Sequence, residues 1–352
     1  MEKQSSWDAF FSKISEETKQ KANDAVADCK SQEEVNKIIE KVTDDVSKSL
    51  CADLKKSENT ILKVKEKQRS SFNKRLCKLW RKPLDLLNLF LILSEEIGRS
   101  YNERFRTEKA KQNDIVLDVL IRLHAHSSLI SREIFTLLCN GYASGAEARW
   151  RSLYETTVIV FFIAEHDRDV AEKYLLHEKI ETYKGMEQYN KYAEKLNGNP
   201  FSEKEVKQAK EIKDNLCKKY GESFAYDYGW AASELKKEKP NFSDLEESIC
   251  LYYWRPYYKM ASHSVHPSAK SLSFTLGLKN MGNIMLAGPS NADLEKPGCR
   301  TAISISQINS VLLTREPDYL NLVVAKILLY LSEEIQQEFL IAAQSIGEQV
   351  IH

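Results

Sequence analysis

Three charged residues share one stripe of a helix that becomes apolar on every side. Glu147, Arg151 and Glu155 recur at every fourth position, and the stripe continues into Val158 and Phe162. A helix that is apolar all round is buried, so we expect the stripe to enter the protein, where unpaired charge costs several kcal/mol. These charges form either a salt-bridge network that ties the helix to its neighbours or the polar groups of an active or ligand site.

The best candidate partner for this stripe is His266, in the densest cluster of histidine and hydroxyl groups in the chain. The proline that follows disfavours helix, so we expect His266 at or just past a helix C-terminus, where the dipole favours an imidazolium. There it acts as a general acid or base oriented by Glu155, or it caps the helix by bonding to a carbonyl. The candidate catalytic residues are Arg151, Glu155 and His266, and the candidate substrate-binding residues near them are Glu147, Ser262, His263 and Ser268.

The clearest nucleic-acid signal is the segment 63–82, where nine Lys or Arg residues stand against one Glu, a net charge of +8. Such a run can follow a phosphate backbone of RNA or DNA, with an affinity that falls steeply with salt. Lys74, Arg75 and Lys78 are the candidate substrate contacts. The alternative is a solvated helix face that pairs with the acidic N-terminal helices. A core-facing stripe within the segment is formed by Phe72, Leu76, Leu79 and Trp80.

Other chemistries have weaker signals. His263-x2-His266 and His124-x-His126 lack a carboxylate at helical ligand spacing, and His-Glu-x-x-His is absent, so we expect no metal ion and no other cofactor. Gly-x-Ser-x-Gly and phosphate-cradling glycine loops are also missing. The seven cysteines are scattered and form no Cys-x-x-Cys pair, which is typical of reduced thiols in a cytosolic protein.

Composition indicates an all-α protein, a multi-helix bundle with an extended charged N-terminal helical region. Lys plus Arg equal Asp plus Glu at 51 each, so global charge points to no partner. No glycine precedes position 98, and prolines are widely spaced, so long stretches lack helix breakers. Apolar runs reach about ten residues, half of a membrane-spanning helix, and the polar N-terminus is unlike a secretory signal. We therefore expect a cytoplasmic protein that does not enter a membrane.

Three parts are expected along the chain. They are a charged and basic N-terminal helical region (1–110), a central helical bundle with the candidate site (111–276), and a loop plus a C-terminal helical pair (277–352). Glycine and proline residues predict a long loop over 277–300. The expected helices lie at about 83–105, 113–141, 147–164, 166–196, 202–219, 242–254, 256–265, 303–315 and 318–346.

Four segments follow one another within residues 115–275. They are Leu137–Ala146 leading into Arg151-Ser-Leu-Tyr-Glu155, a Tyr-rich helix from Tyr174 to Tyr192, Gly229–Ala232, and Tyr-x3-Ser-x3-His-Pro-Ser from Tyr258 to Ser268. In this order the segments resemble a bacterial all-helical family known only as a domain of unknown function. The resemblance implies no settled activity, and it implies a mobile or antiviral defence context because some members are thought to belong to such loci.

A looser likeness is to the helical nucleotide-binding ribonucleases of toxin and defence systems, which use an Arg, four to six residues and a His near the mouth of a helical dimer. Here seven residues separate Arg255 from His263 and ten separate it from His266, so Arg151 and Glu155 would have to complete the site. This likeness implies a homodimeric, metal-independent effector acting on RNA, in which Arg151 stabilises phosphate charge. Two alternatives stay open: a non-enzymatic helical sensor or scaffold, and a nucleic-acid-binding partner in a multi-protein system.

Overall fold

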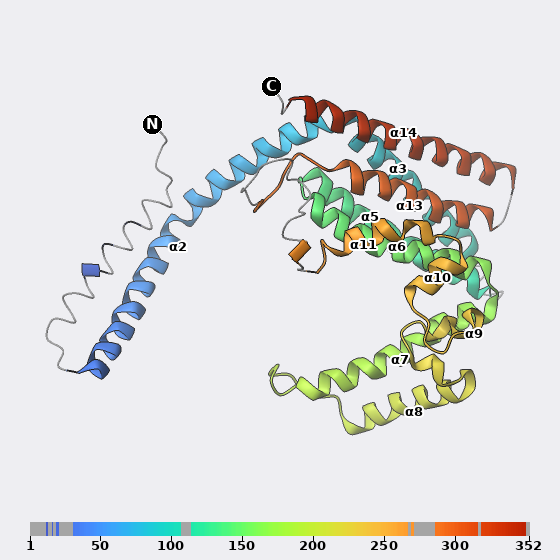
Figure 1. Ribbon diagram of the computed structural model, residues 1–352, viewed down its shortest axis with the longest axis horizontal. Coiled ribbons are helices and arrows are strands. Elements are labelled where there is room, and N and C mark those ends of the chain that lie inside the picture. Colours follow the sequence, from blue (N-terminus) through green and yellow to red (C-terminus); the bar gives the residue numbers. More distant parts are fainter. Residues whose placement is uncertain are drawn as a thin grey trace. The chain divides into compact units, whose positions relative to one another are not determined.

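The protein is all-α wherever its structure is described, as expected. The computed structural model describes residues 31–106, 114–266, 269–270, 286–315 and 318–349, with isolated positions 12, 16, 19 and 20, and none of these residues is in a strand (Figure 1). Contacts divide the chain into two compact units, Met1–Phe72 and Asn73–His352. The expected boundaries at residues 110 and 276 divide the sequence. The described helices before and after each of these boundaries contact one another within the second unit.

One long helix makes up most of the described part of the first unit. α2 (Gln32–Leu79) begins there and continues beyond Phe72. Ser31 caps its start, because the Ser31 Oγ accepts a hydrogen bond from the backbone N–H of Glu34 at 3.3 Å. No glycine or proline interrupts the sequence of α2, which allows a helix of this length.

A bundle of long helices forms the core of the second unit. Helix α13 (Glu295–Thr314) contacts each of the other members. Those members are α3 (Arg81–Tyr101), α5 (Ile115–Cys139), α6 (Ala143–Glu165) and α14 (Tyr319–Gln349), and a π-helical turn (Asn102–Arg106) follows α3. The largest buried side chains among the described residues of the bundle are Trp80, Trp150, Tyr154, Phe90, Phe162 and Phe339.

A tight turn sets α6 beside α5. Gly141 follows the C-terminus of α5 with φ of 77°, a left-handed conformation that a side chain disfavours. The backbone N–H of Tyr142 returns to the carbonyl of Leu137 at 2.9 Å and closes the helix end. The charged stripe of α6 therefore begins directly after this turn.

Shorter elements surround the bundle. α7 (Arg168–Tyr192) packs on α8 (Glu203–Tyr220), and buried Trp230 contacts the rings of Phe162 and Tyr174, so the aromatic segment 224–230 joins α6 to α7. None of the described helices combines the length and apolar composition needed to cross a bilayer. The remaining elements are η2 (Glu222–Ala225), η3 (Gly229–Ala231), α9 (Ala232–Leu235), α10 (Phe242–Ser248), η4 (Tyr252–Trp254) and α11 (Arg255–Ser262).

The expected loop over 277–300 was wrong at its C-terminal end, because α13 already begins at Glu295. Pro297 lies in the first turn of α13, where a missing N–H breaks no helical hydrogen bond. Gly298 faces the ring of Phe339 on α14, and a Cβ at this position would come within 2.7 Å of Cε1. Both residue types are typical of loops, but here Pro297 lies in the first turn of a helix and Gly298 allows a close contact between two helices.

The expected helix over 242–254 was also wrong, because two short elements take its place. α10 ends at Ser248, and Cys250 has φ of 57°. A residue in this left-handed conformation cannot continue an α-helix. After Cys250 the chain forms the 3₁₀ turn η4 and then α11, which contacts α6.

Candidate functional site

The charged stripe of α6 is buried at its ends and open in its middle. Glu147 is only 3% exposed, and Val158 and Phe162 are fully buried. The side chains of Arg151 and Glu155 are 23% and 33% exposed. The expected burial therefore holds for Glu147, whereas Arg151 and Glu155 reach solvent.

A tyrosine from α11 joins Arg151 to Glu155. The hydroxyl of Tyr258 accepts a hydrogen bond from Nη2 of Arg151 at 2.7 Å and donates one to Oε1 of Glu155 at 2.6 Å. Arg151 and Glu155 also form an i,i+4 ion pair at 3.3 Å. Because Tyr258 itself is 8% exposed, the three side chains form a compact network whose outer edge is open.

Burial and charge set the protonation of this network. Burial and the hydrogen bond to Glu155 raise the pKa of Tyr258 to about 12, although Arg151 opposes the shift. Burial alone would lower the pKa of Arg151, but the hydrogen bond to Tyr258 and the charge of Glu155 raise it overall. Burial and the nearby Glu155 carboxylate also raise the pKa of Tyr228. The phenols are therefore neutral and Arg151 is cationic at neutral pH.

His266 lies at the exposed edge of the network, and its Nε2 is 3.5 Å from Nη1 of Arg151. It follows α11 as expected, and its backbone N–H bonds to the carbonyl of Ser262 at 3.0 Å. A guanidinium only donates, so in this contact Nη1 of Arg151 is the donor and Nε2 of His266 the acceptor. The imidazolium expected from the helix dipole stays a prediction.

The structure brings the three candidate catalytic residues together, but it joins them differently from the expected order. Glu155 was expected to orient His266, whereas its Oε1 accepts the Tyr258 hydroxyl. Glu155 therefore reaches His266 through Arg151, which contacts both. We name these four side chains, Arg151, Glu155, Tyr258 and His266, the α6–α11 cluster.

Neighbouring candidates have more local roles. Ser262 is half-buried and its Oγ donates to the carbonyl of Tyr258 at 2.9 Å, so it supports the end of α11. His263 is half-buried beside it. Ser268 lies outside the described residues.

Glu147 pairs elsewhere, with Arg300 of α13. The guanidinium of Arg300 lies 5.2 Å from the ring centroid of Trp150 and 4.5 Å from that of Tyr257, and burial lowers its pKa to about 10. One carboxylate oxygen of Glu147 is buried without a hydrogen-bond partner. For Glu147 the geometry is that of a buried ion pair between helices.

A second buried ion pair fixes α10 and α11 on α6. Glu246 is fully buried, pairs with Arg255, and accepts the hydroxyl of Tyr154 at 2.9 Å. Desolvation raises the pKa of Glu246. Arg255, the arginine of the imperfect Arg–His spacing, is thereby bound to a structural partner.

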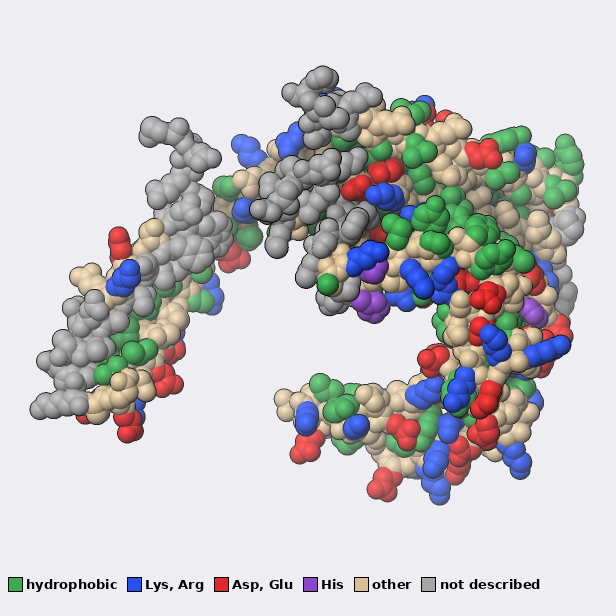
Figure 2. Space-filling model, viewed as in Figure 1, with side chains coloured by type: hydrophobic (Ala, Val, Ile, Leu, Met, Phe, Trp, Pro, Cys, Tyr) green, Lys and Arg blue, Asp and Glu red, His purple; other side chains and the backbone are tan. Residues whose placement is uncertain are grey.

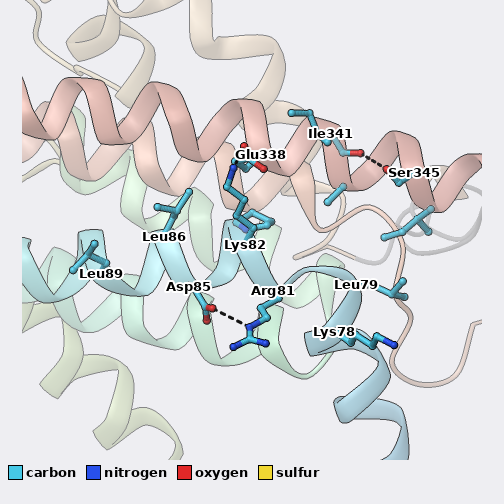
Figure 3. Close-up of a pocket in the computed structure, with 13 residues that line it drawn as sticks. Lys78, Leu79, Arg81, Lys82, Asp85, Leu86, Leu89, Glu338, Ile341 and Ser345 are labelled. Atoms are coloured by element: carbon cyan, nitrogen blue, oxygen red, sulfur yellow. Dashed lines mark hydrogen bonds and ion pairs between the residues drawn. The ribbon is translucent and has the colours of Figure 1, made fainter.

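Lys74, Arg75 and Lys78 are exposed near the end of α2. Lys78 lines a surface groove of about 630 Å³ between the start of α3 and the C-terminal half of α14, which Lys82 and Glu338 bridge by an ion pair (Figure 3). No residue of the α6–α11 cluster lines this groove. Trp80 is buried and its Nε1 donates to a backbone carbonyl, so it belongs to the core stripe.

The cluster offers one cation, one carboxylate, one neutral phenol and one exposed imidazole. These groups can bind an anion and move a proton. Among the described residues, no group of three or more His, Cys, Asp or Glu side chains could hold a metal ion. His124 is buried, and its Nε2 contacts Asn309 at 3.0 Å.

Sequence reasoning gave Tyr258 no role and did not single out Arg300. The signal for Tyr258 is its spacing: Tyr258, Ser262 and His266 recur at every fourth position, so they share one face of the chain. No comparable signal marks Arg300, whose partner Glu147 is 153 residues away.

Comparisons with known proteins address only the central part of the chain. No curated protein and no solved structure matches the chain. Residues 117–284 match the model of a family described as "Family of unknown function (DUF5677)". Over this segment, the expected resemblance to an uncharacterised all-helical family is confirmed.

Proposed function

We propose that the protein is a bacterial defence or toxin-type effector that acts on RNA at the α6–α11 cluster. The observation that carries the proposal is the approach of Arg151 to His266 at an exposed edge, although 115 residues separate them in sequence. Metal-independent RNA cleavage can use a cation to stabilise phosphate charge and a neighbouring imidazole to transfer a proton. The looser likeness to helical ribonucleases supports the same class.

In this reaction Nε2 of His266 removes the proton from a ribose 2′-hydroxyl. The 2′-oxygen attacks the adjacent phosphorus, the bond from phosphorus to the 5′-oxygen breaks, and the leaving 5′-oxygen takes a proton from water. The products are a 2′,3′-cyclic phosphate and a 5′-hydroxyl end. Arg151 stabilises the charge that develops on the phosphate oxygens, and Tyr258 with Glu155 holds its guanidinium in place.

The test is cleavage of end-labelled single-stranded RNA in the presence of EDTA, with the product ends identified by mass spectrometry. We expect cyclic phosphate ends from the wild-type protein and a loss of at least about 100-fold in rate for His266→Ala. His126→Ala is the matched control, because His126 is also exposed but lies on α5. Equal rates for wild type and His266→Ala would refute the assignment.

The basic segment would supply substrate affinity in this proposal. Lys74, Arg75 and Lys78 are exposed, and each phosphate contact contributes about 0.7 to the salt dependence of single-strand binding. Replacing all three with Gln should lower the slope of log K against log[salt] by about 2. An unchanged slope would make the segment a solvated helix face.

The proposal also includes a homodimer in the cytoplasm. Sedimentation of the purified protein tests whether it is a dimer.

A non-enzymatic sensor or scaffold is the second candidate. It is favoured by the contacts that Arg151 already makes within the protein, because its Nη2 donates to Tyr258 and pairs with Glu155. In a scaffold, Arg151→Ala lowers the melting temperature and His266→Ala changes no activity. A nucleic-acid-binding partner without cleavage would instead bind RNA or DNA with a steep salt dependence.

A further inference from the structure

Beside the α6–α11 cluster, three exposed tyrosines lie on η4 and α11. We infer that the surface of Tyr252, Tyr253 and Tyr257, which we name the tyrosine platform, binds single-stranded RNA by stacking on its bases. The inference rests on the proposed function for the choice of RNA as the ligand. It adds a binding surface and a strand preference to that function.

The three rings are exposed and belong to one chain of ring contacts. Tyr252, Tyr253 and Tyr257 are 59%, 58% and 44% exposed. Tyr253 and Tyr257 both contact the ring of Trp254, with centroid distances of 6.1 and 5.5 Å, and Tyr252 contacts Tyr253 at 6.3 Å. Nucleic-acid bases stack on such rings with little dependence on sequence.

Trp254 anchors the platform to the rigid bundle. Its ring lies 6.3 Å from Trp150 and 6.4 Å from Tyr154, both buried on α6. The platform therefore has a fixed position, and stacking on it orders few additional side chains.

The sequence that contains the platform is poor in acidic residues. The sequence from Ser248 to Ala292 contains no Asp or Glu, although these residues make up 51 of 352 in the whole chain. Lys259 and Lys270 in this stretch are exposed. Figure 2 shows Lys, Arg and His side chains close to hydrophobic ones around α11, with Asp and Glu side chains nearby toward α10. This composition favours an anionic ligand.

The platform adjoins the candidate cleavage site. Tyr257 directly precedes Tyr258 in α11, and it contacts the guanidinium of Arg300, which pairs with Glu147. Glu147 lies one helical turn before Arg151 on α6. Tyr257 of the platform and Tyr258 of the α6–α11 cluster therefore lie next to each other on different faces of α11.

Stacking on side chains requires unpaired bases, so the inference distinguishes single strands from duplexes. Bases in an A-form duplex stack on each other and offer no free face to a protein ring. We therefore expect the platform to select single-stranded RNA, and duplex binding to be insensitive to changes in the tyrosines.

The experiment uses the full-length wild-type chain and a fluorescein-labelled 2′-O-methyl-uridine oligonucleotide of about 12 nucleotides. This probe has no 2′-hydroxyl and cannot be cleaved, so binding is measured apart from catalysis. We expect Tyr253→Ala to weaken binding about fivefold or more in fluorescence anisotropy. Tyr253→Phe keeps the ring and should bind within about twofold of wild type.

Tyr330→Ala is the matched control, because Tyr330 on α14 is also 58% exposed. The inference is overturned if the probe does not bind at low salt, if Tyr253→Ala binds like wild type, or if Tyr330→Ala loses as much affinity. It is also overturned if a duplex of equal length depends on Tyr253 in the same way, or if Tyr253→Ala only dissociates a protein dimer in sedimentation. Tyrosine-dependent probe binding without any RNA cleavage would support the platform and refute the cleavage proposal.

Discussion

The buried ion pair between Glu147 and Arg300 gives the sharpest test of the structure. Arg300→Met removes the cation and leaves a carboxylate that is 3% exposed on α6. The wild-type pair joins α6 to α13, which lies in contact with every other helix of the bundle. One of the two carboxylate oxygens of Glu147 is buried and has no hydrogen-bond partner.

The expected cost follows from this burial. Removing one partner of a buried ion pair costs about 3–5 kcal/mol, because the remaining charge stays desolvated. Loss of the guanidinium contacts with the rings of Trp150 and Tyr257 adds about 0.5–2 kcal/mol. A free-energy loss of about 4 kcal/mol corresponds to a fall of about 8 °C in the melting temperature of a chain this long.

The assay is thermal unfolding followed by circular dichroism, supported by urea titration. The double variant Glu147→Leu with Arg300→Met removes both charges, so it should be clearly more stable than Arg300→Met alone. Arg81→Met is the control, because its ion pair with Asp85 is exposed on both sides and contributes less than about 1 kcal/mol (Figure 3). A double variant no more stable than Arg300→Met would refute the assignment of the cost to a stranded carboxylate.

Two further predictions concern single groups. The folded pKa of Tyr258 is about 12 against an ordinary 10.0, so its stabilising effect is complete below about pH 10 and lost as pH rises toward about 12. The advantage of wild type over Tyr258→Phe in melting temperature should therefore shrink over this range, and a constant difference would contradict the cause given. Gly298→Ala should cost about 1–3 kcal/mol in urea unfolding because its Cβ meets the ring of Phe339. Gly185→Ala, with open space around it in α7, should stabilise by about 0.5–1 kcal/mol, and equal effects at both sites would refute the packing argument.

The all-α class could be predicted because it depends on local properties of the sequence. Helix-breaking residues are rare, and most expected helices lie within a few residues of those observed. Where the prediction failed, Pro297 and Gly298 indicated a loop by their usual preference. Their actual roles depend on a first helical turn and on Phe339, whose proximity is set by tertiary packing.

The parts of the candidate site that could be predicted are those whose positions follow from residue spacing within one segment. Four-residue spacing placed Arg151 and Glu155 together, and the proline after His266 placed that residue past a helix end. The partner of Glu147 was out of reach, because any buried cation of the chain satisfies the same requirement. Only the packing of α13 on α6 selects Arg300.

The proposed cleavage reaction depends on one donor atom, Nη1 of Arg151. Nη2 already bonds to Tyr258, and Nε is buried, so Nη1 is the donor that faces the exposed edge. Nε2 of His266 now lies 3.5 Å from Nη1, in the place that a phosphate bound to Nη1 would occupy. In the proposed reaction, a phosphate at Nη1 would therefore displace His266 from Arg151, and the Nε2 of His266 would then be free to accept the proton of the 2′-hydroxyl. Because Tyr258 and Glu155 contact the guanidinium on the side away from His266, the structural network and the proposed catalytic site would consist of the same side chains.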